Sequence, residues 1–529
     1  MTTSAIRHPS GLPSDLGRLP RIPASVVHML AEAAESHPDH PAVTFGGTTL
    51  NYARYLRAVA GLAARLRDRV GEGGRIALVM ANSLDMAVAT FAAHAAGAQV
   101  VPLNPNYTDR EVGFMLADAE PDLVIHDRNT AADVAGLCDQ LGVKTVLDAG
   151  ASGTALALEH ADGPDRMSWP LPVHEQLATL QYTGGTTGRP KGANLTHRQL
   201  AVNLAQREAL LPTERGGEVM LCSMPLFHVS AVAMCLHLSC YAASHIVILP
   251  RYRPDWVLDA IGRHRATLMS AGPTIFRGLL SHEALASSDL KSLRWCYSGS
   301  APLPEATLHQ WATATGGIIL EGYGMTEAGP VLTYNPVHGV RKPGSVGLAV
   351  PGSVLQIVDA DDGDRVLGPG EKGEIRVRGP HTMAGYRNLP EATAATLRDG
   401  WVYTGDVGHL DDDGYLFITD RKKDTINVGG FKVYPREVDE VLLEHPAVAD
   451  AAAFGVPDAY YGQIVHACVV PKPGASVSED ELVAHCRRAL VRYKVPHRIQ
   501  LTDSLPKTAV GKLARGKLAE AFEPPDTRS

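Results

Sequence analysis

Residues 182–193 read YTGGTTGRPKGA and combine residue types that suit the binding of a polyphosphate. Glycine lets the backbone approach a ligand closely and point N–H groups toward it, while threonine hydroxyls and a lysine ammonium add donors and charge. The pattern departs from the Walker loop, because Lys191 follows Pro190 and Gly192 stands where Ser or Thr would bind Mg²⁺. A flexible surface linker does not require this combination of glycines, threonines and a lysine after proline. We therefore predict a loop that holds the triphosphate of ATP. Its ligand residues would be Thr183, Gly184, Gly185, Thr186, Thr187, Gly188 and Lys191.

A second segment, EGYGMTE at 321–327, begins where the apolar β-like run GGIIL gives way to a turn. Strand ends are where α/β folds place their ligands, although a hairpin with a surface Glu would give the same pattern. Together with the glycine-rich loop, the segment resembles the adenylate-forming enzymes, which include acyl-CoA synthetases, peptide-synthetase adenylation domains and firefly luciferase. The resemblance implies that Tyr323 stacks on adenine, that Thr326 contacts the α-phosphate and that Glu327 binds Mg²⁺.

The family's adenine-binding segment is matched by SGSAPL at 298–303, where small residues would let the backbone lie flat against a purine ring. On its own this segment would read as an ordinary turn. The resemblance extends the predicted ATP contacts to Gly299, Ser300, Ala301, Pro302, Gly322, Tyr323, Gly324 and Met325.

Two later motifs are similar to the family's ribose and hinge segments. In YTGD at 403–406, Asp406 is expected to accept hydrogen bonds from the ribose hydroxyls on its two carboxylate oxygens, although TGD alone could be a turn or a helix cap. In DRKKD at 420–424, the resemblance implies that Arg421 reaches the ribose or phosphates and that Lys423 is the hinge residue. A solvated charge run is the other interpretation of this cluster. Gly429 and Gly430 would then line the tunnel for the CoA thiol.

The segment PKTAVGKLAR at 506–515 matches the family motif that carries the catalytic lysine, which would be Lys512. A cation that touches both the attacking carboxylate and the α-phosphate would orient the reactants and offset developing charge. A basic tail that binds anions nonspecifically is the alternative.

The segment PLFHV at 225–229 is also similar to the family, and His228 is expected to contact or gate the acid's carboxylate rather than to exchange protons. A structural histidine would fit an apolar stretch equally well. The resemblance places His228, Ser230, Ser298, Gly324, Pro330, Val331 and Leu332 around the acyl group. Hints about the acid conflict, because DRKKDTINVGGFKVYP resembles fatty acid ligases, whereas GYGMTEAGPVL resembles hydroxycinnamate ligases.

Composition excludes several classes of protein. A net charge of −8 and a pI near 6.3 do not indicate a basic surface that would bind nucleic acid. The seven cysteines are scattered without metal-ligand spacing, which indicates reduced core residues of a cytoplasmic protein. Residues 219–250 contain no Asp, Glu, Lys or Arg, but proline and histidines interrupt them, so a buried helix followed by a buried strand is favoured over a membrane span.

Apolar runs such as IALVM, QVVPL, DLVIH and KTVL alternate with Ala-rich helical stretches and predict a layered α/β fold. Short strands after about residue 340 predict a small β subdomain. There, GPGEKG at 368–373 matches a dinucleotide fingerprint only formally, because a strand and not a helix follows it. We expect a loosely ordered lead-in at 1–23, a large domain at 24–419, a hinge at 420–424 and a mobile α+β lid at 425–529.

The resemblance, greatest to fatty acyl-CoA and 4-coumarate-CoA ligases, implies a two-step reaction. An acid and MgATP give acyl-AMP and pyrophosphate, and rotation about Lys423 then admits CoA, which forms the thioester. A fatty acid of medium or long chain and an arylpropenoic acid such as 4-coumarate are the expected substrates. Delivery to a carrier protein or an amine, adenylation of an unusual oxyanion, an inactive nucleotide-binding homologue, and a homodimeric state are left open.

Overall fold

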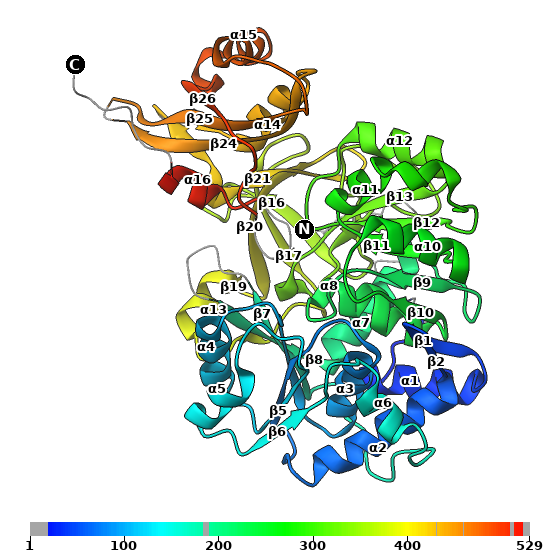
Figure 1. Ribbon diagram of the computed structural model, residues 1–529. Coiled ribbons are helices and arrows are strands. Elements are labelled where there is room, and N and C mark those ends of the chain that lie inside the picture. The colour runs from blue at the N-terminus through cyan, green and yellow to red at the C-terminus, as the bar shows by residue number, and fades with distance from the viewer. Residues whose placement is uncertain (1–18, 184–189, 430, 459, 508–512, 522–529) are drawn as a thin grey trace. The chain divides into compact units, whose positions relative to one another are not determined.

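The computed structural model describes residues 19–183, 190–429, 431–458, 460–507 and 513–521. It divides into two compact units (Figure 1). The first comprises residues 1–354 and 377–402, and the second comprises residues 355–376 and 403–529. The predicted α/β class is confirmed, with a large N-terminal part and a smaller C-terminal part. The predicted boundaries of the lead-in, the large domain, the hinge and the lid stay predictions, and most of the lead-in lies outside the described residues.

The first unit contains two mixed sheets whose central strands are parallel. The nine-stranded sheet has, in order, β15 (Leu348–Ala349), β14 (Thr333–Tyr334), β13 (Ile318–Tyr323), β12 (Trp295–Ser298), β11 (Leu268–Ala271), β9 (Val219–Cys222), β10 (His245–Ile248), β1 (Pro41–Phe45) and β2 (Thr48–Asn51). The seven-stranded sheet has, in order, β18 (Gly385–Tyr386), β8 (Lys191–Thr196), β7 (Leu177–Thr183), β4 (Gln99–Leu103), β3 (Arg75–Val79), β5 (Leu123–His126) and β6 (Thr145–Asp148). The four apolar runs singled out in the sequence are β3 to β6 of this second sheet.

Helices cover both sheets. They are α1 (Val26–Ser36), α2 (Tyr52–Arg67), α3 (Leu84–Ala95), α4 (Asp109–Ala119), α5 (Val134–Leu141), α6 (Ala155–His160), α7 (His197–Leu210), α10 (Pro254–His264), α11 (Pro273–Leu280), α12 (Glu305–Thr315) and α13 (Pro390–Thr396). One buried apolar cluster draws side chains from both sheets and from α1, α2, α3 and α7. A second lies between the nine-stranded sheet and α10, α11 and α12, which run along one face of it in Figure 1. The sheets are therefore covered on both faces, which explains the nearly continuous apolar runs of the parallel strands.

Local chemistry sets the start of several helices. Helix α2 begins at Tyr52, because the Asn51 side chain accepts a hydrogen bond from the backbone N–H of Arg54 at 2.9 Å and so caps the helix. Helix α7 starts with a capping box between Thr196 and Gln199. That cap fixes where the first helix after the predicted phosphate loop begins.

The apolar stretch at 219–250 forms β9, a buried helical segment and β10. The helical segment consists of α8 (Val229–Ala231), the π-helix η2 (Val232–His237) and α9 (Leu238–Tyr241). The expectation of a helix followed by a strand is confirmed, and β9 precedes them. Within the described residues, no helix is both long and apolar enough to cross a membrane. All seven cysteines lie in the described ranges, and each is buried and free.

The second unit holds most of the predicted β subdomain and the C-terminal part. The subdomain strands are β16 (Val354–Val358), β17 (Gly373–Arg378), β19 (Leu397–Arg398), β20 (Trp401–Leu410) and β21 (Leu416–Arg421). Of these, β16, β17 and β20 cross the dividing line between the units, and β19 lies in the first unit. Because β17 follows GPGEKG directly, this segment is confirmed not to open a helix. The C-terminal strands are β22 (Ile426–Val428), β23 (Phe431–Val433), β24 (Val448–Asp458), β25 (Gly462–Pro471) and β26 (Arg498–Leu501). They pack with α14 (Pro435–Leu443) and α15 (Glu479–Ala489), and α16 (Arg515–Ala521) follows.

Candidate active site

The two ends of the predicted phosphate loop are held side by side in the seven-stranded sheet. Strands β7 and β8 are antiparallel, and Thr183 at the end of β7 pairs with Lys191 at the start of β8. The hydroxyl of Thr183 donates to the carbonyl of Lys191 at 3.4 Å. Before the loop, the phenol of Tyr182 donates to the carboxylate of Asp118 at 2.6 Å, which ties β7 to α4. Gly184, Gly185, Thr186, Thr187 and Gly188 lie outside the described residues.

Tyr386 joins the phosphate loop to the predicted metal ligand. It lies in β18, which pairs with β8, and its ring lies 5.2 Å from the Lys191 ammonium, within the range of a cation–π contact. Its hydroxyl donates to Oε1 of Glu327 at 2.7 Å. Burial, followed by the charge of Glu327 and the hydrogen bond to it, raises the pKa of Tyr386, so the hydroxyl stays a donor. Lys191 and Glu327, 136 residues apart in the sequence, thus share one tyrosine, which the sequence argument missed.

The turn that carries Glu327 folds tightly on itself. It leaves β13 at Tyr323 and runs through the short 3₁₀ helix η4 (Thr326–Ala328), and the N–H of Leu332 then donates to the carbonyl of Tyr323 at 3.0 Å. A Cβ at Gly324 would lie 1.7 Å from the carbonyl oxygen of Pro330, so this position requires glycine. The turn therefore brings the predicted residues Thr326, Pro330, Val331 and Leu332 together, with Met325 half-buried and Glu327 only 7% exposed.

The predicted adenine segment lies beside that turn. Strands β12 and β13 are parallel, and Ser298 at the end of β12 pairs with Glu321, just before Gly322. A Cβ on Gly299 would lie 3.5 Å from the carbonyl oxygen of Gly322, so the two segments nearly touch. Ser298 is buried, whereas Ser300, Ala301 and Pro302 are exposed. The carboxyl ends of two neighbouring parallel strands thus lie side by side at one edge of the sheet, which is where α/β sheets bind ligands.

His228 precedes the helical segment that begins at α8. Its Nδ1 accepts a hydrogen bond from the N–H of Ser230 at 3.3 Å, and both side chains are half-buried. Gln181, two residues before the end of β7, donates to the carbonyl of Phe227 at 3.1 Å. That bond, which the sequence did not suggest, ties the segment carrying His228 to the strand that leads into the phosphate loop.

The predicted ribose ligand and its partner lie in the second unit. Asp406 in β20 faces Arg421 in β21, with Nε of Arg421 3.0 Å from Oδ1 of Asp406. Asp406 is 5% exposed. The Nε of Arg421 binds the carboxylate of Asp406. Two charged side chains that can form strong hydrogen bonds therefore lie together at this point of the sheet.

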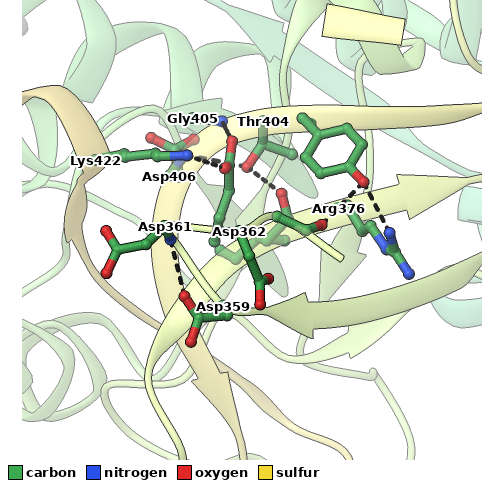
Figure 2. A network of polar contacts seen from close by, with 12 residues as sticks. Asp359, Asp361, Asp362, Arg376, Thr404, Gly405, Asp406 and Lys422 are labelled. Carbon is green, nitrogen blue, oxygen red and sulfur yellow. Dashed lines mark hydrogen bonds and ion pairs between the residues drawn. The ribbon is translucent and has the colours of Figure 1, made fainter. Parts of the chain in front are cut away.

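A network of polar contacts fixes the strand on either side of Asp406 (Figure 2). The Thr404 hydroxyl donates to the carbonyl of Ile375 at 2.8 Å and accepts from the N–H of Asp406 at 3.1 Å. The carboxylate of Glu374 accepts from the N–H of Gly405 at 3.2 Å and from the Lys422 ammonium at 2.6 Å. Lys422 thus has a structural partner, and it ties the predicted hinge segment to β17.

The remaining predicted residues are also in the second unit. Lys423 lies in the 3₁₀ helix η5 (Lys422–Asp424), 3.7 Å from the carboxylate of Asp424, and burial lowers its pKa. Gly429 has a positive φ of 58° and donates its N–H to the carbonyl of Tyr461 at 2.7 Å. Gly430 and Lys512 lie outside the described residues.

The segment that precedes and follows 508–512 is anchored within the second unit. Lys507 and Leu513 form an isolated β-bridge, and the N–H of Ala514 donates to the carbonyl of Pro506 at 2.9 Å. Arg515 is paired with the buried carboxylate of Asp439 and donates to the carbonyl of Ala453 at 2.6 Å. The residues just before and just after 508–512 therefore lie next to each other.

Comparison with known proteins places these motifs in a family. The AMP-binding enzyme family matches residues 30–387, and the AMP-binding enzyme C-terminal domain matches residues 437–512. The chain belongs to the AMP-binding enzyme family. The resemblance drawn from the motifs is thereby confirmed, and with it the expectation of an enzyme.

Relatives in this family extend over nearly the whole chain. A long-chain-fatty-acid–CoA ligase of Bacillus subtilis is 36% identical, with 97% of each chain covered. A feruloyl-CoA synthase of an Amycolatopsis species is 38% identical, with 92% of this chain and 97% of the relative covered. The crystal structure of ATP-bound MatB from Rhodopseudomonas palustris aligns with a TM-score of 0.87 at 32% identity, covering 94% of this chain and 98% of that one. This AMP-binding enzyme therefore shares its architecture with a nucleotide-bound relative.

Proposed function

We propose that this protein is an AMP-forming acid–CoA ligase. In the first half-reaction a carboxylate oxygen of the acid attacks the α-phosphorus of ATP, and the bond to the leaving pyrophosphate breaks, which gives acyl-AMP. In the second, the sulfur of CoA attacks the acyl carbon, AMP leaves, and the thiol proton passes to solvent. The relatives named as fatty-acid–CoA ligase and feruloyl-CoA synthase support a CoA acceptor and an acid with an apolar body.

The arrangement of Lys191, Tyr386 and Glu327 carries this proposal. A cation at the end of the phosphate loop and a carboxylate at the end of a neighbouring element are both held by one tyrosine. A triphosphate needs such a pairing, because the ammonium neutralises phosphate oxygens directly, whereas the carboxylate holds a divalent cation.

The residues present fit Mg²⁺. Protein sites usually hold Mg²⁺ through one or two carboxylates together with substrate phosphates, and Glu327 is a buried carboxylate with one oxygen engaged by Tyr386. Mg²⁺, when bound, would supply the charge that offsets the phosphate oxygens. Within this proposal Glu327 holds the ion, Tyr386 orients Glu327, and Thr326 donates its hydroxyl to the α-phosphate.

The acid would lie between His228, Ser230, Ser298 and the turn formed by Gly324, Pro330, Val331 and Leu332. His228, whose Nδ1 already accepts from Ser230, would present its other ring nitrogen to the carboxylate and orient it for attack. The adenine would lie along Gly299, Ser300, Ala301, Pro302, Gly322 and Tyr323. The contacts between β12 and β13 support this, because they make one surface of the two segments.

The second unit would supply the remaining groups. We propose that Asp406 and Arg421 bind the ribose, that Lys423 is the hinge, that Gly429 and Gly430 admit the CoA thiol, and that Lys512 is the catalytic cation of adenylation. Arg421 and Asp406 already form an ion pair, so the ribose hydroxyls would join an existing pair of charged groups. A cytoplasmic location and a homodimer belong to the same proposal.

Pyrophosphate release and thioester formation test the function together. Purified protein with ATP and Mg²⁺ is given a panel of fatty and arylpropenoic acids, with and without CoA. The proposal predicts acid-dependent pyrophosphate release and a thioester that appears only with CoA. Release without a thioester would point to an amine, a carrier protein or another acceptor. Absence of release with every acid would favour an inactive nucleotide-binding protein.

A further inference from the structure

Three buried histidines come together in the core of the first unit. His94 lies near the end of α3, His197 is the first residue of α7, and His237 is the last residue of η2. The ring centre of His94 lies 5.2 Å from that of His197 and 6.3 Å from that of His237. His94 and His197 are 1% exposed and His237 is 3% exposed. We call the three residues the histidine cluster.

The histidine cluster lacks acceptors for additional protons. Among the described residues, no hydrogen-bonding partner lies within reach of Nδ1 of His94, Nδ1 of His197 or Nε2 of His237. A neutral imidazole carries one N–H, whereas a protonated ring carries an N–H on both nitrogens and a positive charge. A buried charge without a partner is very costly. The core therefore favours the neutral form of all three rings.

The surroundings leave little room for water to solvate a charged ring. Two internal cavities of about 10 and 20 Å³ adjoin the histidine cluster, and His237 lines both, while His94 lines the larger one. Each cavity has space for about one water molecule. One water cannot replace the hydration shell of an imidazolium ion, so a proton on the cluster would stay poorly solvated while the fold is intact.

The charged groups that face the histidine cluster also oppose its protonation. Besides the three rings themselves, the titratable groups whose charge acts on them are His28 in α1 and His174 before β7. Arg207, which forms an ion pair with Glu208, lines the smaller cavity together with His237. The other residues that line the two cavities are uncharged. None of the groups that shift the pKa of the three rings is a carboxylate.

The sign of the resulting pH dependence follows from burial. Burial lowers the pKa of His237 to about 4 and, together with neighbouring rings, lowers the pKa of His197 to about 3 and that of His94 well below 6.5. Since the unfolded chain binds these protons near pH 6.5, the stabilisation is complete above that pH and is lost as pH falls toward 4. Each ring then lowers the folding equilibrium constant about tenfold per pH unit, so three rings lower it by up to about a thousandfold.

The histidine cluster adjoins the supports of the proposed active site. The larger cavity is also lined by Thr179 and Gln181 of β7, the strand that leads into the predicted phosphate loop. The smaller cavity is lined by Asn203, whose side chain forms hydrogen bonds of 2.7 and 2.9 Å with the backbone of Val331. Val331 belongs to the turn that carries Glu327. Loss of packing around the cluster would therefore release the strand and the turn together.

We propose that the histidine cluster is an acid-sensitive switch. When its rings take up protons, α3, α7 and η2 lose their packing, the strand before the phosphate loop and the Glu327 turn are released, and activation of the acid substrate stops. The change is reversible because no covalent bond breaks. The loss of the fold does not depend on the reaction catalysed, whereas the loss of activity rests on the proposed ligase function.

Acidification of the wild type is the first test. Urea unfolding and pyrophosphate release are measured from about pH 7.5 to about pH 5, and release is measured again after return to the higher pH. Release is expected to fall as the folding equilibrium constant falls and to recover on return. Activity that falls while the folding equilibrium constant stays constant would overturn the inference. Absence of release at every pH with every acid would speak against the ligase function, whereas the unfolding data would still decide the switch.

Hydrogen exchange at the ring carbon reports the protonation of each histidine in the folded wild type. The three rings are expected to stay neutral in the folded protein down to about pH 5. Titration of two or more of them near pH 6.5 would overturn the inference without bearing on the ligase function. This measurement needs no variant.

Variants locate the pH dependence in the histidine cluster. His94→Leu, His197→Leu and His237→Leu each remove one titrating ring, and each is expected to weaken the pH dependence of the folding equilibrium constant by about tenfold per pH unit. The pH of half-inactivation should fall by about half a unit. His309→Leu is the control, because it removes a histidine of the same unit whose side chain is 74% exposed, and it should match the wild type. A wild-type pH dependence in every folded cluster variant would overturn the inference.

Discussion

Single side chains decide how the proposed phosphate site is assembled, and Tyr386 shows this most directly. It contacts Lys191 through its ring and Glu327 through its hydroxyl, so one residue orients both the cation and the carboxylate. A tyrosine performs both tasks because its ring face attracts a cation while its hydroxyl donates to an anion. Phe lacks the hydroxyl and Ser lacks the ring, so neither residue could make both contacts.

We expect Tyr386→Phe to reduce kcat/KM for pyrophosphate release by about tenfold to a hundredfold, because it removes a hydrogen bond to a charged group. The apparent affinity for Mg²⁺ should fall as well, since Glu327 loses its orienting donor. Tyr386→Leu should be worse, because the contact with Lys191 is lost too. A titration of initial rate against Mg²⁺ for all three proteins gives the comparison. Indistinguishable curves for Phe and Tyr would contradict the role assigned to the hydroxyl.

At the level of elements, short polar contacts fix how helices meet. In α3, Asp85 is fully buried and its Oδ1 accepts from the N–H of Ala157 in α6 at 2.7 Å. Burial raises the pKa of Asp85 from 3.8 to about 6, although backbone hydrogen bonds act in the other direction. The folded protein thus favours the neutral carboxyl more than the unfolded chain does.

The sign of the pH dependence follows from this shift. A carboxyl whose folded-state pKa is raised gives its full stabilisation below the unfolded value near 4 and loses it as pH rises through about 6. We expect the wild type to gain stability relative to Asp85→Asn between pH 7 and pH 4.5, by at most about 3 kcal/mol. Unfolding temperatures of both proteins across that range measure the difference. Parallel profiles would show that Asp85 does not titrate as stated.

The whole molecule consists of two compact units, and the proposed chemistry divides between them. Lys191, His228 and Glu327 belong to the first, whereas Asp406, Arg421 and the segment around 508–512 belong to the second. In the proposed cycle the second unit contributes Lys512 during adenylation and the glycines at 429 and 430 during thioester formation. One acid site could thus serve two reactions.

We expect Lys512→Ala to abolish acid-dependent pyrophosphate release while thioester formation from supplied acyl-AMP and CoA stays within about threefold of the wild type. The control is Lys507→Ala, which removes a partly exposed ion pair with Asp450 at 3.1 Å and should leave both half-reactions nearly unchanged. Both rates are measured by separate assays on the same preparations. Equal loss of the two half-reactions in Lys512→Ala would remove this lysine from its assigned role.

The amino-acid sequence determined much of the fold and the candidate nucleotide site. Buried strands such as β3 and β4 are visible as apolar runs because both faces of a parallel sheet are covered. The phosphate loop and the Glu327 turn are recognisable because their glycines and polar residues are contiguous. Gly324 shows the physical reason, since a Cβ there would collide with the carbonyl oxygen of Pro330, six residues later in the same turn.

Only the tertiary structure decided which distant residues meet. Tyr386 reaches Glu327 and Lys191 because β18 pairs with β8, and Gln181 reaches Phe227 because β7 ends beside the segment before α8. The burial of Arg207 likewise depends on how α7 packs against η2. Strand pairing and helix packing bring together residues that are far apart in the chain, and a local pattern of residue types cannot predict such contacts.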